Sequence, residues 1–299
     1  MDTRGNLTTS DGAVADPSAE VAWATADLFY ETEQFAAFMS LLLTMEDLKW
    51  AQSPAAGVDW PLISELFGRG VAVTTAHVNS IPIAEYVLRS ALDHFQQAEQ
   101  WRAAQGSHTW GHHEFREVFA STWLVYGLGS IGSEVATRAR AFGVHVIGVR
   151  RNPSGDEPVD EMITPDQVKG LLSRCDVVVL SAPGTSTTTR LVDDEFLGMM
   201  KADSLLVNIA RGAIVDEPAL LRALDEGPLG RAVLDVMDVE PLPEDHPFWD
   251  HPKVTVTPHN AAGGTPRLLR AAELFSENLC RYIDGRPLLN LVTRAELES

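Results

Sequence analysis

Three side chains of types that transfer protons or bind anions follow predicted buried strands in the second half of the chain. They are Arg211, Glu240 and His259, and each comes after a run of mainly apolar residues. The carboxyl ends of strands in an open α/β sheet meet at one edge, where ligands bind. Histidine and glutamate commonly transfer protons, and arginine is suited to anions. We therefore expect these residues to form a catalytic site at that edge.

A glycine-rich turn precedes these residues. Residues 127–132 read Gly-Leu-Gly-Ser-Ile-Gly, between a predicted strand and a predicted helix. This is the context in which such a motif binds a dinucleotide. Gly127 permits a tight turn, Gly129 lets a pyrophosphate approach the backbone, and Gly132 lets the helix pack on the strand. A turn without a ligand is the alternative, and the context favours a cofactor site.

The end of the next predicted strand bears on the choice of cofactor. An NAD site places an acidic residue about 20 residues beyond the glycine turn, where it binds the ribose 2′-hydroxyl. Here the strand ends in Arg150 and Arg151, and no acid occurs before Asp156. Two guanidinium groups could clamp a 2′-phosphate, or they could merely be solvated on a loop. We expect NADP(H) to be preferred, with NAD(H) possible.

Several segments resemble those of the D-isomer-specific 2-hydroxyacid dehydrogenase family, and in particular its glyoxylate/hydroxypyruvate reductase branch. They occur in the family's order within roughly residues 20 to 292. The matching segments are 55–59 (Ala-Ala-Gly-Val-Asp), 82–88 (Pro-Ile-Ala-Glu-Tyr-Val-Leu), 127–132, 208–217 (beginning Asn-Ile-Ala-Arg-Gly), 234–243 (beginning Leu-Asp-Val) and 257–259 (Thr-Pro-His). The resemblance implies hydride transfer between a nicotinamide cofactor and C2 of a small 2-oxo or D-2-hydroxy acid.

The resemblance also implies a role for each catalytic residue. His259 would exchange the proton of the substrate oxygen as the acid/base. Glu240 would orient the imidazole and stabilise its cation. Arg211 would hold the substrate carboxylate and polarise the carbonyl. The backbone N–H groups of Ala56 and Gly57 would help to bind the carboxylate.

The same resemblance supplies further cofactor contacts. Asp235 matches a residue that contacts the nicotinamide carboxamide, although it could simply cap a strand end. Thr188 matches a threonine in a loop beneath the cofactor. The full expected cofactor set is Gly127, Gly129, Ser130, Ile131, Gly132, Arg150, Arg151, Pro183, Thr188, Ile209, Ala210, Asp235 and His259. Trp249 could pack beside the site or in the core.

The elements that must position these residues indicate an α/β fold. Buried strands alternate with helices, which predicts a Rossmann-type doubly wound parallel sheet, covered on both faces. A smaller flavodoxin-like substrate domain, shortened at its N-terminus, would accompany it. We expect a flexible tail (1–18), a discontinuous substrate domain (19–88 with 266–299) and a dinucleotide-binding domain (89–265). One long helix (83–104) would connect the domains, and another would cover 266–284.

Composition limits the partners and the compartment. The chain has 299 residues and a formal net charge of −19, which disfavours nucleic acid and anionic membranes. Residues 35–45 form an apolar stretch too short to span a membrane. No signal peptide is evident, and Cys175 and Cys280 read as buried free thiols, so we expect a cytoplasmic protein. Relatives of the resembled family commonly form homodimers, and we expect the same here.

No metal site is expected. His108, His112 and His113 lie together, but the glycines near them disfavour a regular helix, so a surface loop near the cleft is favoured over a metal site. A catalytically weak NAD(P)-binding regulatory module of the corepressor type is the alternative function, because the substrate domain looks shortened. Formate dehydrogenases are disfavoured, since they resemble this sequence but carry glutamine where Glu240 stands.

Overall fold

The computed structural model describes residues 18–25, 32–58 and 60–297. Its contacts divide the chain into two compact units, one of residues 1–79 with 264–299 and the other of residues 80–263. We call them unit 1 and unit 2. All but the last residue of the predicted tail (1–18) lies outside the described residues, as does Asp59 of the 55–59 segment.

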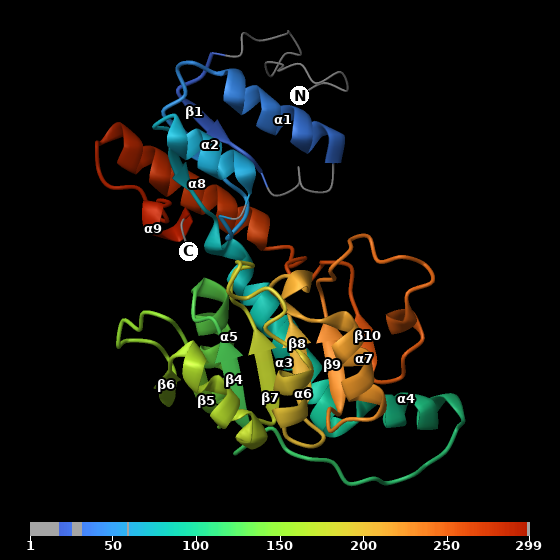
Figure 1. Ribbon diagram of the computed structural model, residues 1–299. Coiled ribbons are helices and arrows are strands. Elements are labelled where there is room, and N and C mark those ends of the chain that lie inside the picture. The colour runs from blue at the N-terminus through green and yellow to red at the C-terminus, as the bar shows by residue number, and fades with distance from the viewer. Residues whose placement is uncertain (1–17, 26–31, 59, 298–299) are drawn as a thin grey trace. The chain divides into compact units, whose positions relative to one another are not determined.

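Unit 2 is built on a seven-stranded sheet in which every neighbouring pair is parallel, as Figure 1 shows. The spatial order is β10-β9-β8-β7-β4-β5-β6. Its strands are β4 (Thr122–Tyr126), β5 (His145–Val149), β6 (Glu161–Ile163), β7 (Val177–Leu180), β8 (Leu205–Asn208), β9 (Arg231–Leu234) and β10 (Val254–Val256). The chain winds outward from β4 in both directions, which confirms the doubly wound fold. The order reverses between β4 and β7, where ligands bind in such sheets.

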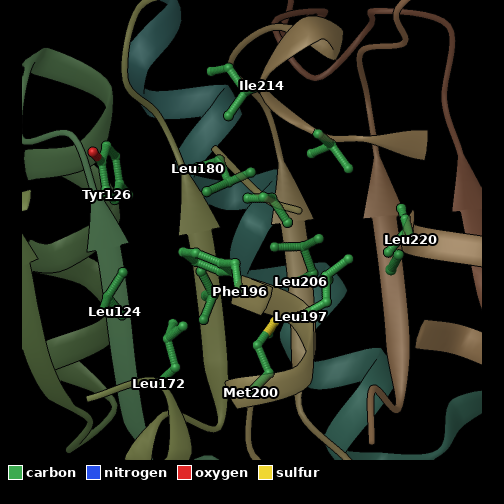
Figure 2. Close-up of a cluster of buried hydrophobic side chains, with 14 of the residues drawn as sticks. Leu124, Tyr126, Leu172, Leu180, Phe196, Leu197, Met200, Leu206, Ile214 and Leu220 are labelled. Atoms are coloured by element: carbon green, nitrogen blue, oxygen red, sulfur yellow. The ribbon is translucent and has the colours of Figure 1, made fainter. Parts of the chain in front are cut away.

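Helices cover both faces of this sheet because successive strand residues point to opposite sides. One face packs against α3 (Ser80–Gln96) and α5 (Ser130–Ala141). The other packs against α6 (Asp194–Met199) and α7 (Glu217–Asp225). Figure 2 shows part of the second core, in which Phe196, Leu197 and Met200 lie against strand residues. The buried sheet gives the loops at its carboxyl edge a rigid base.

Side-chain caps fix where several helices begin. The Asp193 carboxylate accepts from Phe196 N (2.9 Å) at α6, and the Asp216 carboxylate accepts from Ala219 N (3.1 Å) at α7. A capping box formed by Thr164 and Gln167 opens a 3₁₀ helix (Pro165–Gly170).

The prediction of one helix over 83–104 is wrong. Two helices replace it, α3 and α4 (Ala98–Gly106), and Gln97 lies between them with φ +54°. The buried face of α3 ends near Phe95, whereas α4 has no buried residue. Because no apolar stripe on α4 continues that of α3, nothing in the sheet's packing keeps the two segments in line.

The acid-rich run over 156–161 ends in a strand that its composition does not indicate. Glu161 begins β6, which pairs with β5 through Ile147↔Glu161 and Val149↔Ile163. The strand has three residues, and only Ile163 is buried. A short edge strand of this kind leaves little alternation in the sequence.

Unit 1 contains a smaller parallel sheet of three strands in the order β1-β2-β3. Its elements are β1 (Val21–Trp23), α1 (Thr32–Thr44), β2 (Trp50–Gln52), α2 (Pro61–Gly68), β3 (Ala72–Thr74), α8 (Arg267–Ile283) and α9 (Arg294–Leu297). The rings of Trp23 and Trp50 stack on Phe275 of α8, with centroids 4.5 and 5.3 Å away. The buried Asn278 of α8 donates to Gln52 Oε1 (3.3 Å) and to the Leu289 carbonyl (3.2 Å).

The two cysteines differ in exposure. Cys175 is buried, as predicted, and burial raises the pKa of its thiol to about 12. Cys280 is exposed, so the prediction of two buried thiols is wrong. On α8, Cys280 lies two residues beyond the buried Asn278 and therefore points away from the core. Within the described residues, every helix is too short or too polar to cross a membrane.

Candidate active site

The glycine turn has the geometry that a dinucleotide site needs. Gly127 has φ +98°, and a Cβ there would lie 2.6 Å from Ala182 N. A Cβ on Gly132 would lie 2.0 Å from the Gly127 carbonyl oxygen, so this residue lets α5 approach the turn. A Cβ on Gly129 would meet nothing within 4 Å, and no side chain caps α5. The turn thus presents open space beside the N–H groups that begin a helix, and these fit a pyrophosphate.

The turn after β8 positions Arg211. Asn208 is fully buried, accepts from Ala210 N (3.1 Å) and donates to the Arg211 carbonyl (2.9 Å). A Cβ on Gly212 would lie 1.8 Å from the Met237 carbonyl carbon, so glycine is required for this turn to meet the loop after β9. Asn208 therefore fixes the segment that contains Ile209, Ala210 and Arg211. The signal for that role was a polar residue at the end of an apolar strand.

The loop after β7 lies against the same turn. A Cβ on Gly184 would lie 3.0 Å from Cγ of Arg211. Thr188 is buried, and its hydroxyl donates to the Pro183 carbonyl (2.8 Å) and accepts from Thr185 N (2.8 Å). The structure thus brings Pro183, Thr188 and Arg211 to one edge of the sheet.

His259 and Glu240 form a hydrogen-bonded pair. His259 Nδ1 lies 2.9 Å from Glu240 Oε2, and the other carboxylate oxygen accepts from Met237 N (3.0 Å). An ionised carboxylate only accepts hydrogen bonds, so Nδ1 carries the hydrogen and Nε2 faces elsewhere. Both side chains remain partly exposed, at 52% and 39%. The pair can therefore exchange a proton with a molecule bound at the surface.

Asp235 holds the loop that contains His259. Its carboxylate is buried and accepts from the Thr257 hydroxyl (2.6 Å), from Asn260 N (2.8 Å) and from Ala261 N (3.0 Å). Its carbonyl accepts from His259 N (2.8 Å). His259 has φ +50°, a conformation that costs energy for a residue with a side chain. These bonds stabilise that conformation, which sequence reasoning did not foresee.

A second hydroxyl extends this network to α3. The Tyr86 hydroxyl lies 2.7 Å from Thr257 Oγ1. Because Thr257 donates to Asp235, Tyr86 is the donor to Thr257. Burial raises the pKa of Tyr86, so the phenol keeps its hydrogen at neutral pH. The sequence contained Tyr86 in a recognised segment without indicating this bond.

The two expected phosphate-clamp residues lie on the loop after β5. Val149 ends the strand, and its carbonyl accepts from Gly127 N (3.0 Å), so Arg150 begins directly beside the glycine turn. Arg150 and Arg151 are both exposed. Arg150 Nη1 pairs with Glu157 Oε1 at 3.0 Å, a partner that the sequence did not reveal.

Three further groups of candidates are described by their own surroundings. Ala56 and Gly57 belong to unit 1, in a turn where the Ala55 carbonyl accepts from Ala76 N (2.8 Å). His108 and His112 are exposed, and no group of metal-ligating side chains occurs in the described ranges. Trp249 is half exposed and donates to the Pro243 carbonyl (2.8 Å), so it is not a core residue.

Known proteins are similar to this chain in sequence. The family model described as "D-isomer specific 2-hydroxyacid dehydrogenase, NAD binding domain" matches residues 88–261. D-3-phosphoglycerate dehydrogenase from Bacillus subtilis is 34% identical over 83% of this chain and 48% of that protein. Glyoxylate reductase from Aeropyrum pernix is 35% identical over 68% of this chain and 60% of that protein. The chain spans about half the length of the first curated relatives that it matches.

Solved structures are similar over most of the chain. A D-isomer-specific 2-hydroxyacid dehydrogenase from Xanthobacter autotrophicus, in complex with NADPH and MES, has a TM-score of 0.76 and 31% identity. The match covers 96% of this chain and 89% of that one. An NADPH-dependent glyoxylate/hydroxypyruvate reductase from Sinorhizobium meliloti, in complex with NADP and sulfate, has a TM-score of 0.74 and 28% identity. That match covers 93% of this chain and 85% of the other.

Proposed function

Because this chain belongs to the D-isomer-specific 2-hydroxyacid dehydrogenase family, we propose that it is a nicotinamide-dependent oxidoreductase. It transfers a hydride between the cofactor and C2 of a small 2-oxo or D-2-hydroxy acid. The observation that carries the proposal is the 2.9 Å bond between His259 and Glu240, on the sheet that also presents the glycine turn. This arrangement supplies a proton donor where a dinucleotide fold binds its ligands.

Three residues of unit 2 have separate roles in the proposed reaction. The bound cofactor supplies or accepts the hydride, and the chain handles the proton and the charge. His259 gives a proton from Nε2 to the substrate oxygen during reduction and takes it back during oxidation. Glu240 holds Nδ1 and stabilises the imidazolium. Arg211 binds the substrate carboxylate and polarises the carbonyl, since its guanidinium is planar and permanently charged.

We propose a glyoxylate- or hydroxypyruvate-like substrate. Similarity to glyoxylate reductases and to glyoxylate/hydroxypyruvate reductases supports this class. The backbone N–H groups of Ala56 and Gly57, in the substrate domain, would add donors for the carboxylate. Asp235, Thr188, Pro183, Ile209 and Ala210 would line the cofactor site.

We propose that NADP(H) is the preferred cofactor and that NAD(H) is also accepted. The exposed Arg150 and Arg151, at the point where NAD sites place an acid, support this preference. Two of the similar solved structures are described with NADPH or NADP. An Arg150→Asp variant should shift the ratio of NADPH to NADH turnover towards NADH.

We also propose a cytoplasmic homodimer. Both cysteines are free, as in a reducing compartment. The segment 107–121 runs between α4 and β4 without helix or strand, and Trp110 on it is 94% exposed. Phe115 and Phe119 on the same segment are also exposed. Exposed aromatic side chains on one segment favour an interface between subunits.

The decisive experiment follows NADPH and NADH oxidation across a panel of 2-oxo acids. Rapid oxidation with glyoxylate or hydroxypyruvate would support the enzyme, its substrate class and its cofactor together. Cofactor binding without turnover of any acid would instead favour the regulatory module. Failure to bind either cofactor would contradict both functions.

A further inference from the structure

The loop between β5 and β6 closes around one of its own carboxylates. Glu157 Oε1 accepts from Ser154 N (2.6 Å), from Ser154 Oγ (2.9 Å) and from Arg150 Nη1 (3.0 Å). Its Oε2 accepts from Gly155 N (2.8 Å). The Glu157 side chain is only 4% exposed. The hydrogen bonds from Ser154 and Gly155 lower the pKa of Glu157 to about 2, so it is ionised at neutral pH.

These donors are the groups that bind phosphate elsewhere in proteins. Consecutive backbone N–H groups, a hydroxyl and a guanidinium together form a concave anion site. We name this set, Arg150, Ser154 and Gly155, the anion cup. Three donors reach Oε1 of Glu157 and one reaches Oε2, and the side chain is almost fully covered. In this arrangement Glu157 does not offer its carboxylate to a ribose hydroxyl as the acid of an NAD site does.

The anion cup lies beside the glycine turn. The Val149 carbonyl accepts from Gly127 N, and Arg150 follows at once. A Cβ on Gly148 would lie 2.3 Å from Leu128 Cδ1 and 2.9 Å from Val159 Cγ1, so the end of the loop packs against the turn. In a dinucleotide fold this end of the second strand faces the adenosine ribose. The cup is thus close to where a 2′-phosphate would lie.

We propose that Glu157 competes internally with the 2′-phosphate of the cofactor for the anion cup. The inference rests on the proposed dinucleotide site and adds a residue that determines specificity. A phosphate offers more negative charge and more acceptor oxygens than a carboxylate, so it can displace Glu157. The displaced carboxylate moves into solvent. Glu157 thereby lowers the affinity for NADPH and leaves the affinity for NADH unchanged. It therefore reduces the factor by which NADPH is bound more tightly than NADH.

The test measures binding of 2′,5′-ADP and 5′-AMP by calorimetry. These probes differ only in the 2′-phosphate. Glu157→Gln should bind 2′,5′-ADP about tenfold more tightly than wild type, since one charge-assisted contact no longer competes. Binding of 5′-AMP should not change. Arg150→Met should lose the preference for 2′,5′-ADP, because the cup loses its cation.

Asp156→Asn is the matched control. It removes the same charge from the same loop, but Asp156 contacts only the Ser154 hydroxyl among the residues of the cup. Asp156 competes for that single hydroxyl hydrogen alone, whereas Glu157 also accepts from two backbone N–H groups and from Arg150, so Asp156→Asn should change 2′,5′-ADP affinity far less than Glu157→Gln does. Unchanged or weaker 2′,5′-ADP binding by Glu157→Gln would overturn the proposal, as would an equal gain in Asp156→Asn, which would indicate a general charge effect. A protein that binds neither probe and neither NADPH nor NADH would instead refute the dinucleotide site itself.

Discussion

At the scale of single residues, the candidate site depends on His259 being held in one position. Its backbone has φ +50°, its N–H donates to the Asp235 carbonyl, and Nδ1 bonds to Glu240. These contacts fix the ring so that Nε2 is the only nitrogen left for a substrate. A side chain prepared in this way needs little reorganisation when the proton moves.

Replacing His259 with alanine should lower kcat at least about a hundredfold, as expected when an acid–base catalyst is lost. Glu240→Gln should also lower kcat, but less, because an amide still accepts from Nδ1 while it no longer stabilises the cation. Cofactor binding, measured by nicotinamide fluorescence, should persist in Glu240→Gln. Wild-type turnover by His259→Ala would remove this residue from the mechanism.

The two cysteines should react at very different rates. Burial raises the pKa of Cys175 to about 12, so its thiolate is scarce at neutral pH, whereas Cys280 is exposed. Since the thiolate is the reactive form, titration of the native protein with a disulfide reagent should modify one thiol per chain. Unfolding in guanidinium should release the second. Cys280→Ala is the control, and rapid reaction of that native variant would contradict the assignment.

At the scale of elements, short turns with one permitted residue join the strands at the site. Gly212 is the clearest case, because any Cβ there would overlap the Met237 backbone. This contact joins the turn that contains Arg211 to the loop that contains Glu240. A change at this glycine would therefore act on two elements at once.

Gly212→Ala should destabilise the protein by about 1–3 kcal/mol, the usual cost of overpacking. Urea denaturation would measure the loss. Gly198→Ala is a matched control, because a Cβ there meets nothing within 4 Å and the residue lies inside α6. That control should be neutral or slightly stabilising, since alanine favours a helix. Equal free energies of unfolding for the two variants would show that the loop around Met237 shifts to accommodate the added Cβ at little cost.

The elements also show how far the sequence could be interpreted. The buried strands and the glycine turn follow from local patterns, and their prediction is confirmed. The break at Gln97 does not follow from a local pattern, because helical propensity continues through 83–104. Only packing against the sheet distinguishes α3 from α4. The edge strand β6 could not be predicted, because the acidic residues beside it are typical of a solvated loop.

The sequence likewise predicts one part of the candidate site and not the other. Motifs identified Arg211, Glu240 and His259 by type and order, because each follows a predictable strand. The bonds that position them, from Asn208, Met237 N and Thr257, depend on loop conformation and left no pattern. The pairing of Arg150 with Glu157 could not be predicted either, because it depends on the conformation of the irregular loop of six residues between them.

At the scale of the whole molecule, two units of different construction share one chain. Unit 2 is continuous, whereas unit 1 is assembled from residues 1–79 and 264–299. The formal net charge of −19 is that of the whole chain, with both units counted together. Self-association must overcome that charge, so an interface would need apolar side chains such as those of segment 107–121.

The proposed homodimer leads to a prediction for that segment. Sedimentation velocity should find the wild-type protein as a dimer, and Trp110→Ser with Phe115→Ser should shift it towards monomer. The physical reason is loss of apolar area at the interface. Trp249→Ser removes a similarly large exposed ring elsewhere and should leave the dimer intact. A monomeric wild type, or a double variant that stays dimeric, would contradict the interface.

The split construction of unit 1 affects how the protein is made. Domains fold as units while the chain leaves the ribosome from its N-terminus. Strands β1 and β2 emerge first, but α8, whose Phe275 stacks on Trp23 and Trp50, is translated only after the whole of unit 2. During that interval both indole rings lack their cover. A chain whose synthesis stops before α8 would therefore contain a complete unit 2 and an incomplete unit 1 with exposed indole rings. Chaperones or proteases would recognise that exposed apolar surface.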